Sequence, residues 1–294
     1  MVAPRAVVVH RASEWTELLA RHGTRGQVEF FLQQRGQSPA DVAAHHDQLE
    51  AALATVAAGI PTEWRRADVE RAGLPRFAFE PEDVLLVVGQ DGLVANVAKY
   101  LDAQPVIGVD PSPGRNAGVL VPHPPAAAAA LLRQVHDGRA GVCERAMVEV
   151  HSDDGQSLVA LNEIMIGQPG HQSARYLLEV GGHAERQSSS GVIVGTGTGS
   201  SGWCRSIARI QAPQLALPGP TDAALAWFVR EPWPSPTTGA ELVAGRLEGD
   251  TLALRVESDT LVAFGDGVES DRLNLGWGQR VTVGLSARTL RTVA

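Results

Sequence analysis

The periodicity of hydrophobic residues changes near the middle of this 294-residue chain, and that change most constrains the fold. Before about Cys143, short apolar runs alternate with segments of helical periodicity, which predicts parallel strands joined by helices. Beyond it, short alternating runs are separated by glycine-containing turns, which predicts antiparallel hairpins. We therefore expect an α/β N-terminal domain with a parallel sheet, residues 1–124, and a mainly antiparallel β C-terminal domain, residues 125–294.

The first half shows strand and helix signals in alternation. Ser38 is suited to be the N-cap of a helix, with Pro39 in its first turn and Asp41 at its positive end, and Gly59 can end it. A further helix is expected at 92–101. The expected strands read "RAVVVH" (5–10), "DVLLVV" (83–88) and "PVIGVD" (105–110).

Several hairpins are expected in the second half. The stretch "AMVEVHSDDGQSLVALNEIMIGQ" (146–168) predicts two strands about Asp154-Gly155, and "ARYLLEVGGHAERQ" (174–187) predicts a turn at Gly181-Gly182. The proline-rich "REPWPSPTTGAEL" (230–242) predicts a loop inside the second domain.

Composition excludes some classes of protein. The formal net charge of −8 argues against a general nucleic-acid binder, although it leaves room for a small anionic ligand. No run approaches the ~20 apolar residues that span a bilayer. The cysteines, Cys143 and Cys204, stand far apart and form no CxxC motif, so a reducing compartment is the default. We predict a cytoplasmic protein that does not bind a membrane.

A carboxylate stands between two glycines where the strand at 83–88 meets the next helix. Ligands of open α/β sheets collect at the carboxyl ends of strands, and Gly89 and Gly92 allow a close approach of the backbone to an anion. Asp91 is suited to accept the proton of an attacking hydroxyl or to hold a metal ion beside phosphates. The alternative interpretation is a tight turn in which Asp91 caps the helix.

Two further segments carry polar groups in apolar surroundings. After the apolar strand at 192–194, glycines alternate with the hydroxyls of Thr196, Thr198 and Ser200, a pattern that can cradle hydroxyls or phosphate oxygens. A flexible linker is the alternative. In "VALNEIMIG" (159–167), Asn162 and Glu163 are expected inside an apolar strand. Since a buried carboxylate without partners is costly, Glu163 either is paired inside the fold or faces a cleft.

The common phosphate-binding motifs are missing. Lys99 is the only lysine, and no GxxxxGK[ST] surrounds it, which excludes a P-loop. The chain also lacks HExxH and GxSxG motifs and the HRD loop of protein kinases. Phosphoryl transfer would therefore depend on Asp91, a metal ion, backbone amides and arginines such as Arg115 and Arg230.

At these residues the sequence resembles the NAD kinase family, which shares its fold with the diacylglycerol and sphingosine kinases. That family carries a GGDG loop, an Asn-Glu pair in a strand, and a segment of glycine, threonine and serine. The TGTGS form, the following Trp203 and "REP" at 230–232 are most similar to the mitochondrial-type branch. The corresponding stretches here, in the same order, are Gly89-Gln90-Asp91-Gly92, Asn162-Glu163 and Thr196-Gly197-Thr198-Gly199-Ser200.

The resemblance implies a kinase that phosphorylates the 2′-hydroxyl of the adenosine ribose of NAD, giving NADP. Asp91 would be the general base at that hydroxyl, and Asn162 and Glu163 would hold ribose hydroxyls. Thr196, Gly197, Thr198, Gly199 and Ser200 would line the nucleotide cleft between the domains, and Gly89 and Gly92 would approach the ligand. The resemblance also implies ATP or polyphosphate as phosphoryl donor, Mg²⁺, and a homodimer or higher homo-oligomer.

Two positions depart from the family pattern. Gln90 replaces the second glycine of GGDG, where a Cβ opposes a positive φ or crowds a phosphate. Leu93 replaces the usual threonine and removes a hydroxyl. Two other functions therefore stay open: a catalytically silent NAD(P)- or nucleotide-binding sensor on the same fold, and a kinase of another alcohol such as a lipid. The polar Asn162-Glu163 pair argues against a lipid acceptor.

Overall fold

A computed structural model describes residues 3–114 and 118–294. They form two compact units: the first extends to Cys143 and includes Arg291–Ala294, and the second is Glu144–Leu290. We expected the division after residue 124. The first unit extends further because the helix that follows packs on its sheet through Leu131 and Leu132.

The first unit contains a parallel sheet with the strand order β2-β1-β3-β4. The end of β16 (Arg280–Val293) adds a further parallel strand beside β4, so the predicted parallel sheet is confirmed. The elements are, in chain order, β1 (Arg5–His10), α1 (Glu14–His22), α2 (Arg25–Gln34), α3 (Pro39–Gly59), β2 (Arg65–Glu70), η1 (Arg71–Arg76), β3 (Asp83–Val88), α4 (Asp91–Ala98), β4 (Pro105–Val109), η2 (Pro125–Ala127) and α5 (Ala128–His136).

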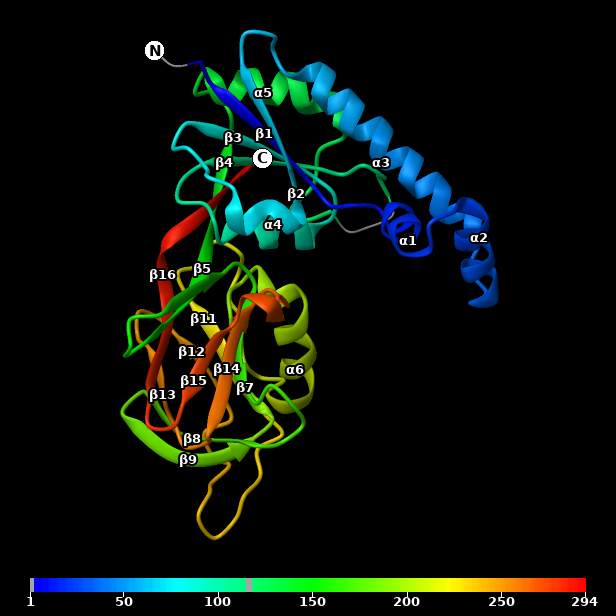
Figure 1. Cartoon of the computed structure of the whole chain (residues 1–294). Helices are drawn as coiled ribbons and strands as arrows, with labels where there is room; N and C mark the ends of the chain where they lie inside the picture. Colours follow the sequence, from blue (N-terminus) through cyan, green and yellow to red (C-terminus); the bar gives the residue numbers. More distant parts are fainter. Residues whose placement is uncertain (1–2, 115–117) are drawn as a thin grey trace. The chain divides into compact units, whose positions relative to one another are not determined.

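Helices cover both faces of this sheet, with α3 and α5 on one side and α4 on the other (Figure 1). Successive side chains of a strand point to opposite faces. In β3, the side chains of Val84, Leu86 and Val88 join the core under α3 and α5. Leu85 and Val87 point to the α4 face and are also fully buried. Burial on both faces explains why β3 is apolar from Val84 to Val88, as strands of parallel sheets are.

The helix α3 begins and ends where the sequence predicts. The Ser38 hydroxyl accepts a hydrogen bond from the amide of Asp41 (3.3 Å), and Pro39 occupies the first turn. The last helical residue is Gly59. Near its end, Val56 is fully buried in the core under the sheet. Local capping and a periodic apolar face therefore determine this helix.

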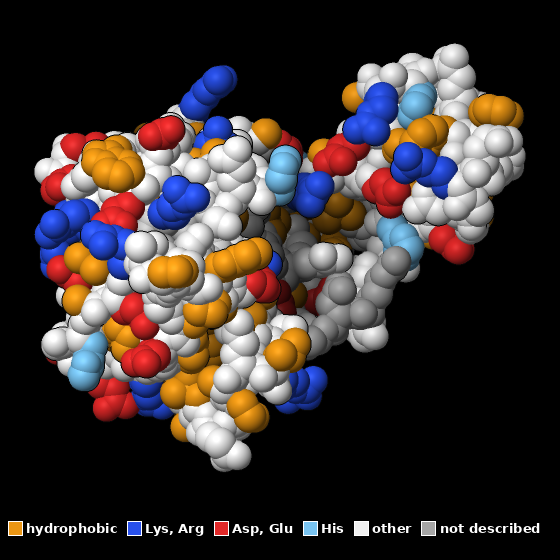
Figure 2. Space-filling model, turned by 90° about the horizontal axis from the view of Figure 1, so that it is seen from below, with side chains coloured by type: hydrophobic (Ala, Val, Ile, Leu, Met, Phe, Trp, Pro, Cys, Tyr) orange, Lys and Arg blue, Asp and Glu red, His pale blue; other side chains and the backbone are white. Residues whose placement is uncertain are grey.

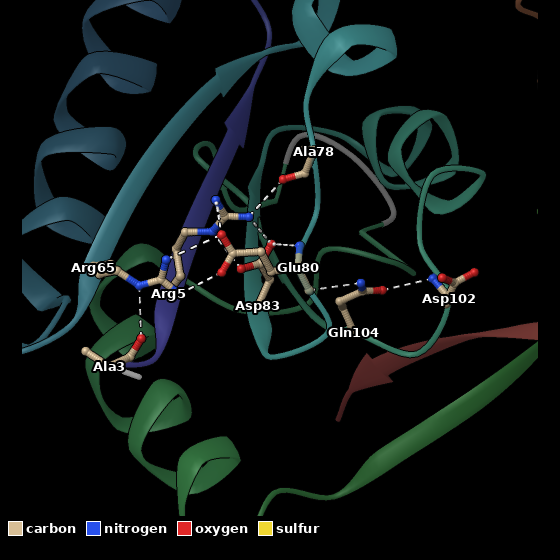
Figure 3. A network of polar contacts seen from close by, with 8 residues as sticks. All are labelled: Ala3, Arg5, Arg65, Ala78, Glu80, Asp83, Asp102 and Gln104. Carbon is tan, nitrogen blue, oxygen red and sulfur yellow. Dashed lines mark hydrogen bonds and ion pairs between the residues drawn. The ribbon is translucent and has the colours of Figure 1, made fainter. Parts of the chain in front are cut away.

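Paired charges hold the amino ends of the strands together (Figure 3). Asp83, only 1% exposed, accepts two hydrogen bonds of 2.7 Å from the guanidinium of Arg5. Glu80 contacts the guanidinium groups of both Arg5 (3.1 Å) and Arg65 (2.7 Å). The Gln104 amide donates to the carbonyl of Glu80 (3.1 Å). The carboxyl edge of the sheet, where ligands of such folds bind, is the opposite one.

The second unit is a mainly antiparallel β structure, as predicted. One sheet has the order β12-β11-β10-β7-β14-β15, and another layer contains β16-β13-β8-β9, with β5 paired to both β16 and β6. Its elements are β5 (Val142–Ser152), β6 (Ser157–Ala160), β7 (Glu163–Gly167), β8 (Ala174–Val180), β9 (His183–Ser189), β10 (Gly191–Gly195), η3 (Gly199–Ser201), α6 (Trp203–Gln211), β11 (Leu225–Arg230), β12 (Ala244–Leu247), β13 (Leu252–Val256), β14 (Thr260–Gly265), η4 (Glu269–Asp271), β15 (Leu273–Gly276) and most of β16.

The six-stranded sheet is buried on both faces. On the inner face, Ile164 of β7 packs in the core that it shares with the other layer. On the outer face, Met165 and Ile193 pack against Cys204 and Ala208 of α6. The alternation along β7 therefore points Glu163, the first residue of that strand, toward the same face as Met165.

Two predictions about strands differ from the structure. No strand was expected at β2, whose alternating charged residues are largely exposed at the sheet edge. The segment 146–168, where two strands were expected, contains most of β5 and all of β6 and β7, because the chain leaves one sheet after β6 and enters the other at β7. Asn162 therefore lies in the connection between strands, and Glu163 begins β7. The predicted turn at Gly181-Gly182 joins β8 and β9, with positive φ at both glycines, 55° and 77°.

Charged side chains of both signs are interspersed on the face shown in Figure 2. Among the described residues, no helix combines the length and the apolar character needed to cross a membrane.

Candidate functional site

The predicted glycine-threonine segment forms a tightly bonded turn after β10, rather than a flexible linker. Thr196 is fully buried. Its hydroxyl donates to the carbonyl of Leu161 (2.6 Å) and accepts from the amides of Thr198 (3.1 Å) and Gly199 (3.3 Å). Its own amide donates to the carbonyl of Asn162 (2.8 Å). Thr196 therefore fastens this turn to the connection between β6 and β7.

The glycines of the turn are required by close packing of backbone on backbone. A Cβ at Gly197 would collide with the carbonyl of Gly219, and a Cβ at Gly199 would collide with the carbonyl of Asn162. Neither glycine has a positive φ among the described residues. The alternation of glycine therefore reflects contact with neighbouring segments more than conformational freedom.

The hydroxyls of this turn differ in what they bind. Ser200 donates to the carbonyl of Thr196 (3.0 Å), so its hydroxyl and that of Thr196 are both used inside the turn. The hydroxyl of Thr198 is buried and has no hydrogen-bond partner within the part of the chain that the structure describes. Because a buried polar atom without a partner is costly, Thr198 is the hydroxyl of this turn best suited to bind a ligand.

Glu163 lies next to this turn, half-buried at the start of β7. Residue 195, which ends β10, pairs with Glu163 across the sheet. No hydrogen bond to the Glu163 carboxylate is found in residues 3–114 and 118–294. Burial first, and then the negative charge of Asp266, raise the pKa of Glu163 to about 7. Burial and then the charge of Glu163 likewise raise the pKa of the Cys204 thiol to about 12. The Glu163 carboxylate is therefore a half-buried acceptor without a hydrogen-bond partner in the described chain.

Asp91 lies in the first unit, at the carboxyl end of β3, where the sequence predicts it. It is the first residue of α4, and Gln90 is the N-cap residue. Its carboxylate accepts hydrogen bonds from the amides of Val119 (3.1 Å) and Leu120 (2.8 Å), one on each oxygen. Since each carboxylate oxygen can accept two hydrogen bonds, the two amides orient Asp91 and leave acceptor capacity on both oxygens.

The two departures from the family loop have plain structural consequences. Gln90 has φ −105° and ψ 167°, an extended conformation that any side chain adopts, so its Cβ causes no backbone strain. Leu93 is 6% exposed and packs over Gly89, where a Cβ would lie 3.0 Å from Cδ2 of Leu93. A Cβ at Gly92 would meet nothing within 4 Å. Leu93 therefore fills space beside the loop in addition to lacking a hydroxyl.

Arg115 and Arg230, which the sequence indicated as candidates to contact phosphate, add little to the description of the site. The guanidinium of Arg230 stacks on the ring of Trp203, 5.4 Å from its centroid, and lies 3.5 Å from the carboxylate of Glu231. Arg115 lies outside the described residues. A cavity of about 460 Å³ opens elsewhere in the second unit, beside Arg175, Arg186 and Trp233, and contains none of the predicted site residues.

Comparisons with known proteins give partial sequence matches. No protein-family model matches the chain. The NAD kinase of Rickettsia peacockii (strain Rustic) is 30% identical over 132 residues, which cover 42% of this chain and 49% of that protein. The NAD kinase of Psychrobacter arcticus is 31% identical over 160 residues, which cover 51% of this chain and 48% of that protein. The chain thus spans about half the length of the curated relatives it matches.

The fold gives a longer match. The crystal structure of yeast NADH kinase complexed with NADH is similar, with a TM-score of 0.59 and 16% identity, over 99% of this chain and 84% of that one. The resemblance to the NAD kinase family is confirmed. The assignment to the mitochondrial-type branch stays a prediction.

The motifs of the second unit that resemble those of NAD kinases form one cluster in this fold. The structure brings Asn162 and Glu163 together with the turn from Thr196 to Ser200. Sequence reasoning missed Asp266, which it assigned only to a turn. Asp266 is indeed in a turn, but its carboxylate also accepts hydrogen bonds from the amides of Leu161 (2.9 Å) and Asn162 (2.7 Å). Because about a hundred residues separate these partners, no local pattern indicates the contact.

Proposed function

We propose that this chain is an NAD kinase-like phosphotransferase that phosphorylates the 2′-hydroxyl of the adenosine ribose of NAD. The observation that carries the proposal is the polar cluster of the second unit. There the half-buried Glu163 carboxylate and the buried Thr198 hydroxyl lack hydrogen-bond partners within the described chain, while Thr196 and the amides of Thr198 and Gly199 hold the neighbouring backbone by hydrogen bonds. Unsatisfied acceptors and donors on a rigid backbone are suited to bind ribose hydroxyls.

In this proposal Asp91 is the general base. It would accept the proton of the 2′-hydroxyl through acceptor capacity that its two amide hydrogen bonds leave free. Those hydrogen bonds fix the carboxylate before substrate binds, which lowers the cost of reaching a productive geometry. Asn162, Glu163 and Thr198 would hold the dinucleotide. Gly92, beside which a Cβ would meet nothing within 4 Å, would let the backbone approach the ligand, while Gly89, Gly197 and Gly199 would keep the surrounding loops closely packed.

The phosphoryl donor would be ATP or polyphosphate, with Mg²⁺. Among the described residues, no group of three or more His, Cys, Asp or Glu side chains is placed to hold a metal ion. The ion would therefore enter with the phosphates of the donor, where it neutralises their charge. A homo-oligomer and a cytoplasmic location remain predictions.

The test is formation of NADP from NAD, or of NADPH from NADH, with ATP, GTP or polyphosphate and Mg²⁺. Asp91→Asn should reduce turnover about a hundredfold or more while NAD still binds, because proton acceptance contributes roughly 10²–10⁴-fold to such reactions. Asp47→Asn, at an exposed position of α3, is the matched control and should leave turnover unchanged. Absence of product with every donor would refute the proposal.

A second function is favoured by the same loop. Both oxygens of Asp91 already accept backbone hydrogen bonds, and Leu93 packs on Gly89, so a catalytically silent NAD(P)-binding sensor is the competing candidate. Calorimetry with NAD, NADP and ATP separates the two functions. Tight dinucleotide binding without turnover supports the sensor.

A further inference from the structure

Asp266 fixes three consecutive backbone units that lead into Glu163. Its carboxylate accepts hydrogen bonds from the amides of Leu161 (2.9 Å) and Asn162 (2.7 Å). Its own amide donates to the carbonyl of Glu163 (3.1 Å). Asp266 achieves this from a left-handed conformation, with φ 53°, directly after β14. The end of β14 thus holds the connection between β6 and β7 from one side.

Thr196 holds the same connection from the other side. Its hydroxyl donates a hydrogen bond to the carbonyl of Leu161 (2.6 Å), and its amide donates one to the carbonyl of Asn162 (2.8 Å). The backbone polar groups of this connection are therefore satisfied by β14 and by the turn after β10. In contrast, no hydrogen bond of the Asn162 or Glu163 side chains is found within the described ranges. The backbone of this connection is therefore held in place, while the side chains of Asn162 and Glu163 keep their hydrogen-bonding capacity for a ligand.

The charge of Asp266 opposes the ionisation of Glu163, so the contact between these two carboxylates does not favour an aspartate here. Asparagine and glycine also tolerate a left-handed conformation. An asparagine, however, offers one acceptor oxygen and would turn its NH₂ group toward the second amide donor. A glycine offers no acceptor. Among residues suited to this φ, aspartate alone offers a separate acceptor oxygen to each of the two amides, as the structure shows.

We propose that Asp266 is a positioning residue, which holds Leu161–Glu163 so that the side chains of Asn162 and Glu163 meet the ligand in one geometry. The ligand is the dinucleotide, and in this respect the inference rests on the proposed function. Asp266 acts through the backbone and does not touch the substrate.

The first test compares Asp266→Asn with Asp259→Asn, a change of the same kind at an exposed site in the same unit. NAD and NADP binding is measured by calorimetry at pH 8, where Glu163 is ionised in both variants. Asp266→Asn should weaken binding about tenfold or more, because one amide loses its acceptor and the connection loosens. Asp259→Asn should bind as the unmodified protein does. Equal affinities for all three proteins would overturn the inference.

The second test needs no ligand. In the unmodified protein, the amides of Leu161 and Asn162 should exchange with solvent slowly, and Asp266→Asn should accelerate both. The NMR titration of the Glu163 carboxyl should move from about 7 toward its ordinary value of 4.5 when the neighbouring charge is removed. A purely remote effect on stability would leave this titration unchanged. Rapid exchange of both amides in the unmodified protein overturns the inference, even if Asp266→Asn fails to fold.

The two tests separate the inference from the proposed function. An unmodified protein that binds no NAD, NADH or NADP refutes the function and, with it, the role of Asp266 toward that ligand. Slow amide exchange that Asp266→Asn abolishes, together with weaker dinucleotide binding, supports both. Normal dinucleotide binding by Asp266→Asn refutes the inference alone and leaves the kinase proposal standing.

Discussion

Replacement of Glu163 by glutamine should stabilise the second unit at alkaline pH. The pKa of Glu163 is raised from 4.5 to about 7 in the folded protein, chiefly by burial. Between these values the folded state retains a proton that the unfolded state has released, so stability falls as pH rises. Glutamine carries no charge at any pH and removes this loss.

The magnitude follows from the two pKa values. A shift from 4.5 to about 7 corresponds to at most about 3 kcal/mol. Because the carboxylate is only half-buried, solvent screening reduces this to about 2 kcal/mol. Glu163→Gln should therefore gain about 2 kcal/mol on the unmodified protein between pH 5 and pH 8. In a unit of this size, that gain corresponds to roughly 4–8 °C in the unfolding midpoint.

Urea unfolding at pH 5, 6, 7 and 8 measures this effect. Both proteins are compared at each pH, so that any pH-independent effect of the amide cancels from the trend. Glu241→Gln is the control, since Glu241 is exposed in the same unit. Its difference from the unmodified protein should not vary with pH. A stability difference for Glu163→Gln that is equally constant would refute the argument that burial makes this carboxylate costly to ionise.

Three further predictions concern packing and buried charge. Gly199→Ala should destabilise the second unit by about 1–3 kcal/mol and abolish dinucleotide binding, because the added Cβ collides with the carbonyl of Asn162. Urea unfolding measures the loss of stability, and calorimetry measures the loss of binding. Gly108→Ala should lower the unfolding midpoint of the first unit at least as much, because its Cβ would overlap the carbonyl oxygen of Leu120. Asp83→Asn should cost about 3 kcal/mol in urea unfolding, because it breaks a buried ion pair.

Controls make these outcomes specific. Gly92→Ala adds a Cβ that meets nothing within 4 Å, so it should leave stability within about 0.5 kcal/mol. Full stability of either collision variant would show that the neighbouring backbone moves aside without cost. An unchanged stability of Asp83→Asn would show that the ion pair with Glu80 alone compensates the partly buried charge of Arg5.

Local signals predicted much of the first unit. Ser38 and Pro39 begin α3 as expected, and the apolar run at 83–88 forms a central strand, because capping and continuous burial act on neighbouring residues. The strand β2 escaped prediction. Its alternating charged residues resemble a solvated segment, and its place at the sheet edge depends on pairing with β1, some sixty residues away.

The candidate site was only partly readable from sequence. The motifs predicted the positions of Glu163 and Thr198. They did not predict the raised pKa of Glu163 or the unpartnered hydroxyl of Thr198, because both depend on contacts between distant segments of the second unit. The sequence pattern treats Thr196 and Thr198 alike, whereas the structure uses one hydroxyl internally and leaves the other without a partner in the described chain. Asp266 carried no signal beyond its turn, since its hydrogen-bond partners are distant in sequence.

The path of β16 has a consequence for the order of folding during synthesis. Residues 291 and 292 pair with β4, and Val293 is 2% exposed in the core of the first unit. A nascent chain that has emerged only as far as α5 therefore lacks one strand of its first sheet. The sheet of the first unit can be completed only after the second unit has been synthesised, because β16 follows it in the chain. Until then the edge of β4 stays unpaired, and an unpaired strand edge is prone to misassembly.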